Sequence, residues 1–152
     1  MVAAALTPVM KAAGFRKRGM HWWIESKETF GFLNVQMSQF GPSFYLNLGV
    51  FLKGLKEDPP LNAHKCQVRY RVENLMPDRA AAHALFDFDR GGFEDDERLE
   101  LVAAAVRDYA LPFLHQCATL DGVRTAIRSK PEIGNYTSFD GMVFLGLKSP
   151  KS

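Results

Sequence analysis

The chain has 152 residues, of which 47% are apolar and 24% are charged, a balance typical of globular domains and not of disordered segments. Its formal net charge of +2 does not by itself indicate a nucleic-acid-binding protein. The length suits one hydrophobic core, so we expect a single domain over residues 1–152.

The segment Met1–Pro8 lacks the basic start and the long apolar run of a secretory signal. No run approaches the 18 apolar residues of a membrane span, so no membrane association is expected. Two cysteines, Cys66 and Cys117, are typical of buried thiols in a reducing compartment. These features together predict a cytoplasmic protein.

A short helix is expected near the start, over residues 7–13. Four apolar residues recur at helical spacing here: Leu6, Val9, Met10 and Ala13. Thr7 is expected to be the N-cap because Pro8 suits the first helical position. Gly14 suits the left-handed residue that often ends a helix.

Strands joined by short turns occupy the next part of the chain. They are expected at about residues 15–27, 29–38, 43–52 and 65–72. The clearest alternation places Phe44, Leu46, Leu48 and Val50 on one side and Tyr45, Asn47 and Gly49 on the other. Consecutive strands with short connections favour an antiparallel sheet.

The second half of the chain is helical in character. Residues 80–88 are ambiguous and suggest a short helix followed by an edge strand at 85–88. The acidic residues at 95–97 complement a helix dipole and open a main helix over 96–111, which Pro112 breaks or kinks. Two short helices are expected at about 121–128 and 139–147.

This order of elements predicts an α+β fold. We expect an antiparallel meander of four to five strands, with the N-terminal helix and the C-terminal helices packed on one face.

Several motifs in the first half resemble a known family. They are Gly14–Gly19 (Gly-Phe-Arg-Lys-Arg-Gly), Trp22, Asn34–Ser38, Phe44–Val50 and Arg69–Arg71. They are similar to a bacterial family of uncharacterised cytoplasmic domains, the domain of unknown function numbered 4304. The resemblance implies a helix, a pleated meander and then helices, and none of the motifs is catalytic. Many small bacterial domains of this kind are immunity or partner-binding proteins of toxin systems, which is an analogy and not an argument from a site.

Two His-x-Cys pairs, His64/Cys66 and His115/Cys117, raise the question of zinc. Residues two apart share a face in a strand but point about 200° apart in a helix, so the second pair cannot chelate together. Structural zinc sites use wider spacings, and we expect both cysteines in the core with no metal bound.

The acidic segment Asp87–Asp95 is compared with a calcium-binding loop. Its fifth position is Gly91, which offers no ligand, and the twelfth, where such loops place a bidentate Glu, is Arg98. An exposed turn followed by a helix start explains the segment better. No cofactor is expected.

No catalytic residue is predicted, because no nucleophile lies in a recognisable motif and no glycine-rich phosphate loop occurs. A hydrolase or transferase whose site forms only in the fold stays open as the alternative. The basic run Arg16–Arg18 beside Trp22 and Trp23 suggests a weak nucleic-acid binder, but a solvated strand end explains it better, so nucleic acid is not the expected partner.

One face of the predicted sheet carries polar side chains suited to binding. Its residues are Asn34, Gln36, Ser38, Tyr45, Asn47, Gln67, Arg69 and Arg71. Tyr and Arg are concentrated in interfaces, and Arg can hold a carboxylate or phosphate through two parallel hydrogen bonds. The other interpretation is an ordinary solvated face. We favour a non-enzymatic binding module for a protein partner, with a small anionic ligand as the second choice.

Overall fold

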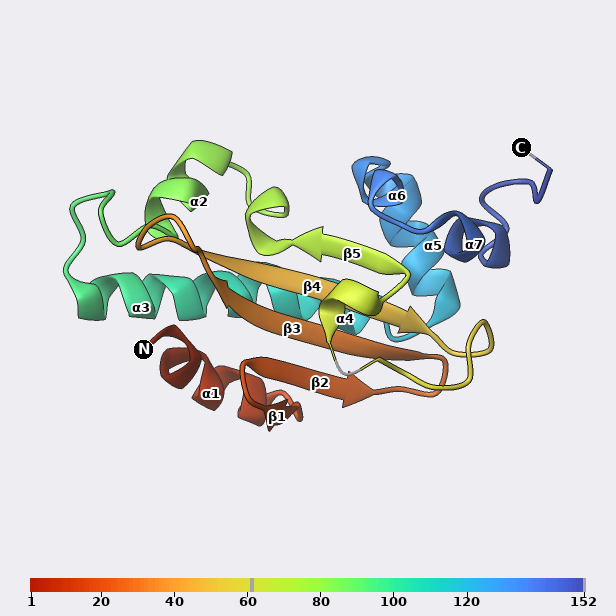
Figure 1. Cartoon of the computed structure of the whole chain (residues 1–152), viewed down its shortest axis with the longest axis horizontal. Coiled ribbons are helices and arrows are strands. Elements are labelled where there is room, and N and C mark those ends of the chain that lie inside the picture. Colours follow the sequence, from red (N-terminus) through yellow and green to blue (C-terminus); the bar gives the residue numbers. More distant parts are fainter. Residues whose placement is uncertain (61, 152) are drawn as a thin grey trace.

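Five antiparallel strands in the order β1-β2-β3-β4-β5 form the centre of the structure (Figure 1). The strands are β1 (Arg16–Arg18), β2 (His21–Glu25), β3 (Thr29–Met37), β4 (Phe44–Leu52) and β5 (Val68–Arg71). The computed structural model describes residues 1–60 and 62–151. Because each strand pairs with its neighbour in the sequence, the sheet is the predicted meander.

Two of the four strands predicted for the meander differ from the observed ones. The segment expected as one strand over 15–27 is a hairpin, because Gly19 takes a positive φ of 61° and turns β1 back onto β2. The strand expected over 65–72 is shorter. It is preceded by the 3₁₀ turn η1 (Ala63–Lys65) and followed by the turn η2 (Val72–Asn74).

The first helix, α1 (Val2–Ala12), is longer than predicted. Its apolar stripe of Val2, Leu6 and Met10 is buried from the first turn onward. Thr7 is therefore inside the helix and not its N-cap, and its Oγ1 donates a hydrogen bond to the carbonyl of Ala3 at 2.9 Å. Pro8 is also internal, since burial of the stripe outweighs the lost backbone bond. Gly14 follows with φ 88°, as predicted.

The main helix continues beyond its predicted end at Pro112. It consists of α3 (Asp95–Ala105), a π-helical segment η3 (Val106–Ala110) and α4 (Leu111–Gln116). Pro112 lacks the N–H that an α-helix requires, and the wider π turn just before it absorbs this defect without ending the helix.

The remaining helices are α2 (Arg79–Leu85), α5 (Leu120–Ser129), α6 (Glu132–Asn135) and α7 (Phe139–Phe144). The helices expected at 121–128 and 139–147 correspond to α5 and α7, whereas α6 was not predicted. The edge strand expected at 85–88 is reduced to one bridge between Ser43 and Asp87. In the described part of the chain, no helix has the length and apolar character to cross a bilayer.

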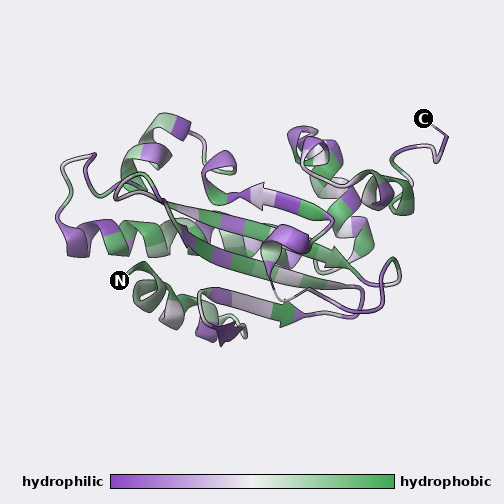
Figure 2. Ribbon diagram, in the orientation of Figure 1, coloured by the Kyte–Doolittle hydropathy of each residue, from purple (hydrophilic) through white to green (hydrophobic). Residues whose placement is uncertain are grey.

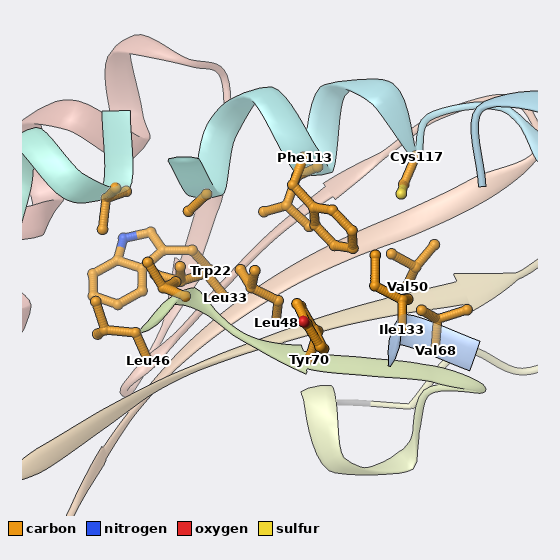
Figure 3. Packing of buried hydrophobic residues seen from close by; sticks show 14 of the residues in the cluster. Trp22, Leu33, Leu46, Leu48, Val50, Val68, Tyr70, Phe113, Cys117 and Ile133 are labelled. Carbon is orange, nitrogen blue, oxygen red and sulfur yellow. The ribbon is translucent and has the colours of Figure 1, made fainter. Parts of the chain in front are cut away.

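The inner face of the sheet packs against the helices, of which Figure 1 shows the main helix (α3, η3 and α4) passing behind it. Figure 3 shows Trp22, Leu33 and Leu48 in the layer between the sheet and the helices, where Phe113 of α4 also lies. Alternate residues of the same strands point to the opposite side, which we call the outer face. Figure 2 accordingly shows hydrophilic bands between hydrophobic ones along the strands.

One end of the outer face is covered by η1, the yellow-green turn drawn in front of the sheet in Figure 1. A small apolar cluster forms beneath it from Phe32, Phe51, Ala63 and Cys66. Gly49 makes this approach feasible, because a Cβ there would lie 2.8 Å from the Cα of Ala63 and 2.9 Å from the Cys66 sulfur. The other end of the outer face is left uncovered by η1 and carries polar side chains.

Candidate functional site

The strand register gathers six of the eight predicted binding residues on the outer face. Asn34 pairs with Asn47, Gln36 pairs with Tyr45, and Asn47 pairs in turn with Arg71. We call the six residues the amide–arginine face: Asn34, Gln36, Tyr45, Asn47, Arg69 and Arg71. They come from three neighbouring strands, so their positions relative to one another are fixed by the sheet.

Asn47 is the centre of the hydrogen bonding on this face. Its Nδ2 donates to Asn34 Oδ1 at 3.0 Å and to Gln36 Oε1 at 2.9 Å. Its Oδ1 accepts from Arg71 Nε at 3.3 Å. Asn34 and Asn47 are only 5% and 7% exposed, so these amides are held in one orientation by their partners.

The Arg71 guanidinium is held from two sides and still faces solvent. Its carbon lies 4.2 Å from the centroid of the Tyr45 ring, and its side chain is 45% exposed. The nearest carboxylate oxygen is Glu73 Oε1, at 4.0 Å from Arg71 Nε. Burial raises the pKa of the Glu73 carboxyl, and the positive charge of Arg71 opposes this shift.

A cleft of about 390 Å³ opens beside β5, and we call it the β5 cleft. It is lined by Asn47, Leu48, Ala63, His64, Arg69, Tyr70, Arg71, Asn74 and Tyr136. Arg69 Nη1 donates to the carbonyl of His64 at 3.3 Å, and the backbone N–H of Arg69 donates to the carbonyl of Tyr136 at 3.2 Å. The cleft therefore joins the amide–arginine face to η1 on one side and to the segment after α6 on the other.

Two of the predicted residues lie apart from this group. Ser38 follows the end of β3, and its Oγ accepts a hydrogen bond from the Phe40 N–H within the turn. Gln67 is 4% exposed, and its Oε1 accepts from the Leu52 N–H at 2.9 Å. In the described structure the Gln67 Nε2 has no hydrogen-bond partner. Gln67 is therefore a buried strand-end residue and is absent from the open surface.

Sequence reasoning missed His21 and Tyr136, and it considered His64 only as a possible zinc ligand and not as a residue of this site. His21 pairs with Asn34, and its pKa is lowered by burial and, to a smaller extent, by His64. His21 could have been found from its alternation with Trp23, had the β1–β2 hairpin been recognised. His64 and Tyr136 carry no comparable signal, because η1 and the segment after α6 reach β5 only through tertiary packing.

Comparison with known families gives a match to the model of the domain of unknown function DUF4304 over residues 6–116 of the 152-residue chain. The chain belongs to this family. Comparison with curated proteins and with solved structures gave no match. The matched part runs from α1 to the end of α4 and so contains the whole sheet and the amide–arginine face. Tyr136 lies beyond it.

The two thiols of this DUF4304 domain lie inside apolar clusters. Burial raises the pKa of Cys117 to about 12. Burial also raises the pKa of Cys66 to about 12, although the charge of Arg69 opposes this. His64 is exposed on η1 while Cys66 points into the small cluster, so the pair does not converge. Within residues 1–60 and 62–151, no three His, Cys, Asp or Glu side chains gather as a metal site would require.

The acidic segment compared with a calcium loop is organised by Arg98. This residue is 1% exposed, and its guanidinium donates to the backbone carbonyls of Ala84, Leu85 and Arg90. It also lies against the rings of Phe88 and Phe93, with centroid distances of 5.5 and 5.1 Å. At the position where a calcium loop places a glutamate, this family member has its own buried cation.

The basic run Arg16–Arg18 occupies β1, at the edge of the sheet opposite β5. Trp22 is buried in the main core, while Trp23 is half-buried on the outer face and pairs with Arg16. The sheet thus separates this basic run from Arg69 and Arg71 and does not combine them in one site.

Proposed function

We propose that this DUF4304 domain is a non-enzymatic binding module that holds a protein partner against the amide–arginine face. The observation that carries the proposal is the stacking of the exposed Arg71 guanidinium on Tyr45, with Asn47 fixing its Nε. A planar guanidinium held in place before binding loses little conformational freedom when a partner docks. Tyr and Arg are also the residue types that dominate binding energy at interfaces.

The contrast along the outer face supports the same proposal. Where η1 covers the sheet, the side chains are aromatic and apolar, and where the sheet is open they are amides, Tyr and Arg. An open face that only needed solvation would suit Lys and Glu equally well. The amides Asn34 and Asn47 are instead buried, and the hydrogen bonds of Asn47 hold the exposed Gln36 and Arg71 in place, which suits a surface whose exposed groups are fixed before a partner binds.

The side chains around the β5 cleft also favour binding over catalysis. They are arginines, amides, tyrosines and one histidine, which recognise polar and anionic groups, while both thiols lie in apolar clusters. The proposal extends to a protein of the bacterial cytoplasm, where such thiols stay reduced. An immunity protein of a toxin system would be one instance of this kind of module.

Capture of the partner and measurement of its affinity test the proposal. Tagged protein is purified gently from the host lysate, co-purifying proteins are identified by native mass spectrometry, and the purified pair is titrated by calorimetry. We expect Tyr45→Ala with Arg69→Ala to raise Kd at least about 30-fold, because truncating interface anchors costs about 2 kcal/mol or more.

The matched control combines Arg107→Ala with Leu101→Ala, two exposed residues of the main helix on the other side of the sheet. This double variant should bind the partner with unchanged Kd. A partner held equally well by both double variants would refute the amide–arginine face as the binding surface. A bare monomer from the lysate would count against the binding module itself.

A further inference from the structure

The β5 cleft has an excess of positive charge. Arg69 and Arg71 both line it, and its described lining contains no Asp or Glu. Among the described residues, no carboxylate oxygen comes within 4.0 Å of Arg69, and Glu73 reaches Arg71 only at that limit. The other ion pairs of the structure join partners at 2.6 to 3.9 Å. The two arginines of the cleft are thus left without close counter-ions by the fold.

The hydrogen bonds of the two guanidinium groups leave donors unused. Arg71 uses its Nε toward Asn47, and Arg69 uses its Nη1 toward the His64 carbonyl. A guanidinium carries five N–H donors, so each group retains several that face the cleft or solvent. Two parallel N–H donors on one guanidinium match the two oxygens of a carboxylate.

The spacing of the two arginines indicates the shape of the ligand. They occupy alternate positions of β5 and lie on the same face, about 7 Å apart along the strand. An extended peptide repeats its side chains on one face with the same period of two residues. Acidic residues at positions i and i+2 of such a peptide would therefore align with the two guanidinium groups in register.

We infer that the β5 cleft binds an extended acidic segment of a protein, with carboxylates at alternate residues held by Arg69 and Arg71. This inference rests on the proposed function and specifies the chemistry of its partner. The cleft volume of about 390 Å³ suits a few side chains. The alternation of charge on the strand distinguishes an extended segment from a single free anion.

Two isomeric peptides test the inference. One is capped Gly-Asp-Ser-Asp-Gly, with carboxylates at alternate residues, and the other is capped Gly-Asp-Asp-Ser-Gly, which has the same composition and charge. Each is titrated into ¹⁵N-labelled protein while the Nε–Hε signals of the arginines are followed by NMR. We expect saturable shifts at Arg69 and Arg71, with the alternating peptide binding at least about threefold more tightly than its isomer.

Variants identify the groups responsible. Arg69→Gln and Arg71→Gln should each weaken the alternating peptide at least about fivefold, whereas the matched Arg107→Gln should leave its Kd unchanged. Arg107 is an exposed arginine on η3 that pairs with its neighbour Asp108 at 3.1 Å. The backbone amide spectrum of each variant shows whether the fold is retained.

Several outcomes would overturn the inference. Equal affinity for the two isomers would show that alternate spacing of the carboxylates does not matter. Shifts of the Arg107 signal as large as those of Arg69 and Arg71 would show general charge attraction. Saturation by inorganic phosphate without saturation by either peptide would make the cleft a site for free anions instead. Partner capture that depends on Arg69 while neither peptide binds would refute this inference and leave the proposed function standing. Peptide binding without any captured partner would refute the proposed function and leave this inference standing.

Discussion

Two arginine environments in this molecule differ in what satisfies the guanidinium group. Arg98 is buried between Phe88 and Phe93 and donates to three backbone carbonyls of the segment before α3. Arg71 also lies against an aromatic ring, that of Tyr45, but one side-chain amide oxygen is its hydrogen-bond acceptor and nearly half of its side chain is exposed. Arg98 stabilises the fold, whereas Arg71 is held in one orientation by the fold and still faces solvent.

This difference distinguishes an arginine that stabilises the fold from one whose donors remain available to bind a ligand. A buried guanidinium is tolerated when most of its donors meet acceptors, which is why the carbonyls of Ala84, Leu85 and Arg90 converge on the two terminal nitrogens of Arg98. Only its Nε has no hydrogen-bond partner among the described residues. An exposed guanidinium does not need such acceptors, so stacking and one hydrogen bond fix its plane and leave the remaining donors available. The comparison predicts opposite consequences when each arginine is removed.

The largest expected effect is on stability, from Arg98→Met. Methionine fills a similar volume but leaves three backbone carbonyls without their donor, so we expect the free energy of unfolding to fall by about 3 kcal/mol. Urea unfolding measures this. Arg71→Met should change stability by less than about 1 kcal/mol, and the exposed Arg107→Met by less than about 0.5 kcal/mol. A loss at Arg98 no greater than that at Arg71 would remove the distinction between the two environments.

The next effect concerns the turn that forms one wall of the β5 cleft. In Gly49→Ala the new methyl group would lie 2.9 Å from both the Ala63 oxygen and the Cys66 sulfur, so η1 must move away from the sheet. We expect a loss of about 1–3 kcal/mol in the free energy of unfolding, and faster reaction of Cys66 with a thiol reagent. Gly41→Ala is the matched control, because a Cβ there meets nothing within 4 Å. Unchanged stability and unchanged Cys66 reactivity would show that η1 does not pack closely against Gly49.

The sequence predicted those parts of the fold that depend on local periodicity. The alternation from Phe44 to Val50 predicted β4 and both of its faces, because side chains in a strand alternate strictly. The same parity placed Asn34, Asn47 and Arg71 on one side, and the strand register confirms that they are neighbours. Thr7 and Pro8 misled the prediction of α1, since a sequence signal for a helix start competed with a buried stripe extending back to Val2.

The parts that escaped prediction depend on contacts between distant segments. Gln67 has the parity of the outer face, yet it is buried beside α7, where a Cβ on Gly141 would lie 3.0 Å from its own Cβ. Tyr136 lines the β5 cleft but belongs to a segment almost seventy residues beyond Arg69. No pattern in the local sequence predicts that these two segments are in contact. Parity along a strand identifies a face but not what covers it.

A smaller effect is expected from Tyr45→Leu, which removes the ring under Arg71 and keeps an apolar side chain. The stability loss should be about 0.5–1 kcal/mol, the usual contribution of an exposed cation–π contact. The mobility of Arg71 should rise, visible as sharper and less dispersed Nε–Hε NMR signals. Tyr45→Phe retains the aromatic face and should behave like the unchanged protein. If Leu and Phe at this position gave the same Arg71 signal, the ring would not be what orients the guanidinium.

The smallest effect is expected from Glu73→Gln, and its sign depends on pH. Burial raises the pKa of Glu73 in the folded protein above its value in the unfolded chain, so the folded state favours the protonated carboxyl. The cost of the charged form is absent below about pH 4 and grows as the pH rises through the raised folded pKa. The neutral glutamine should therefore be more stable than glutamate at pH 7 and equal to it at pH 4, as measured by urea unfolding. Glu100→Gln, on the exposed side of α3, should show no such dependence.

Removing Glu73 also removes the carboxylate nearest to Arg71, so the alternating acidic peptide should bind more tightly. A glutamine variant that is less stable at pH 7 would mean that attraction between Glu73 and Arg71 outweighs the cost of burial, and Arg71 would then stabilise the fold as Arg98 does.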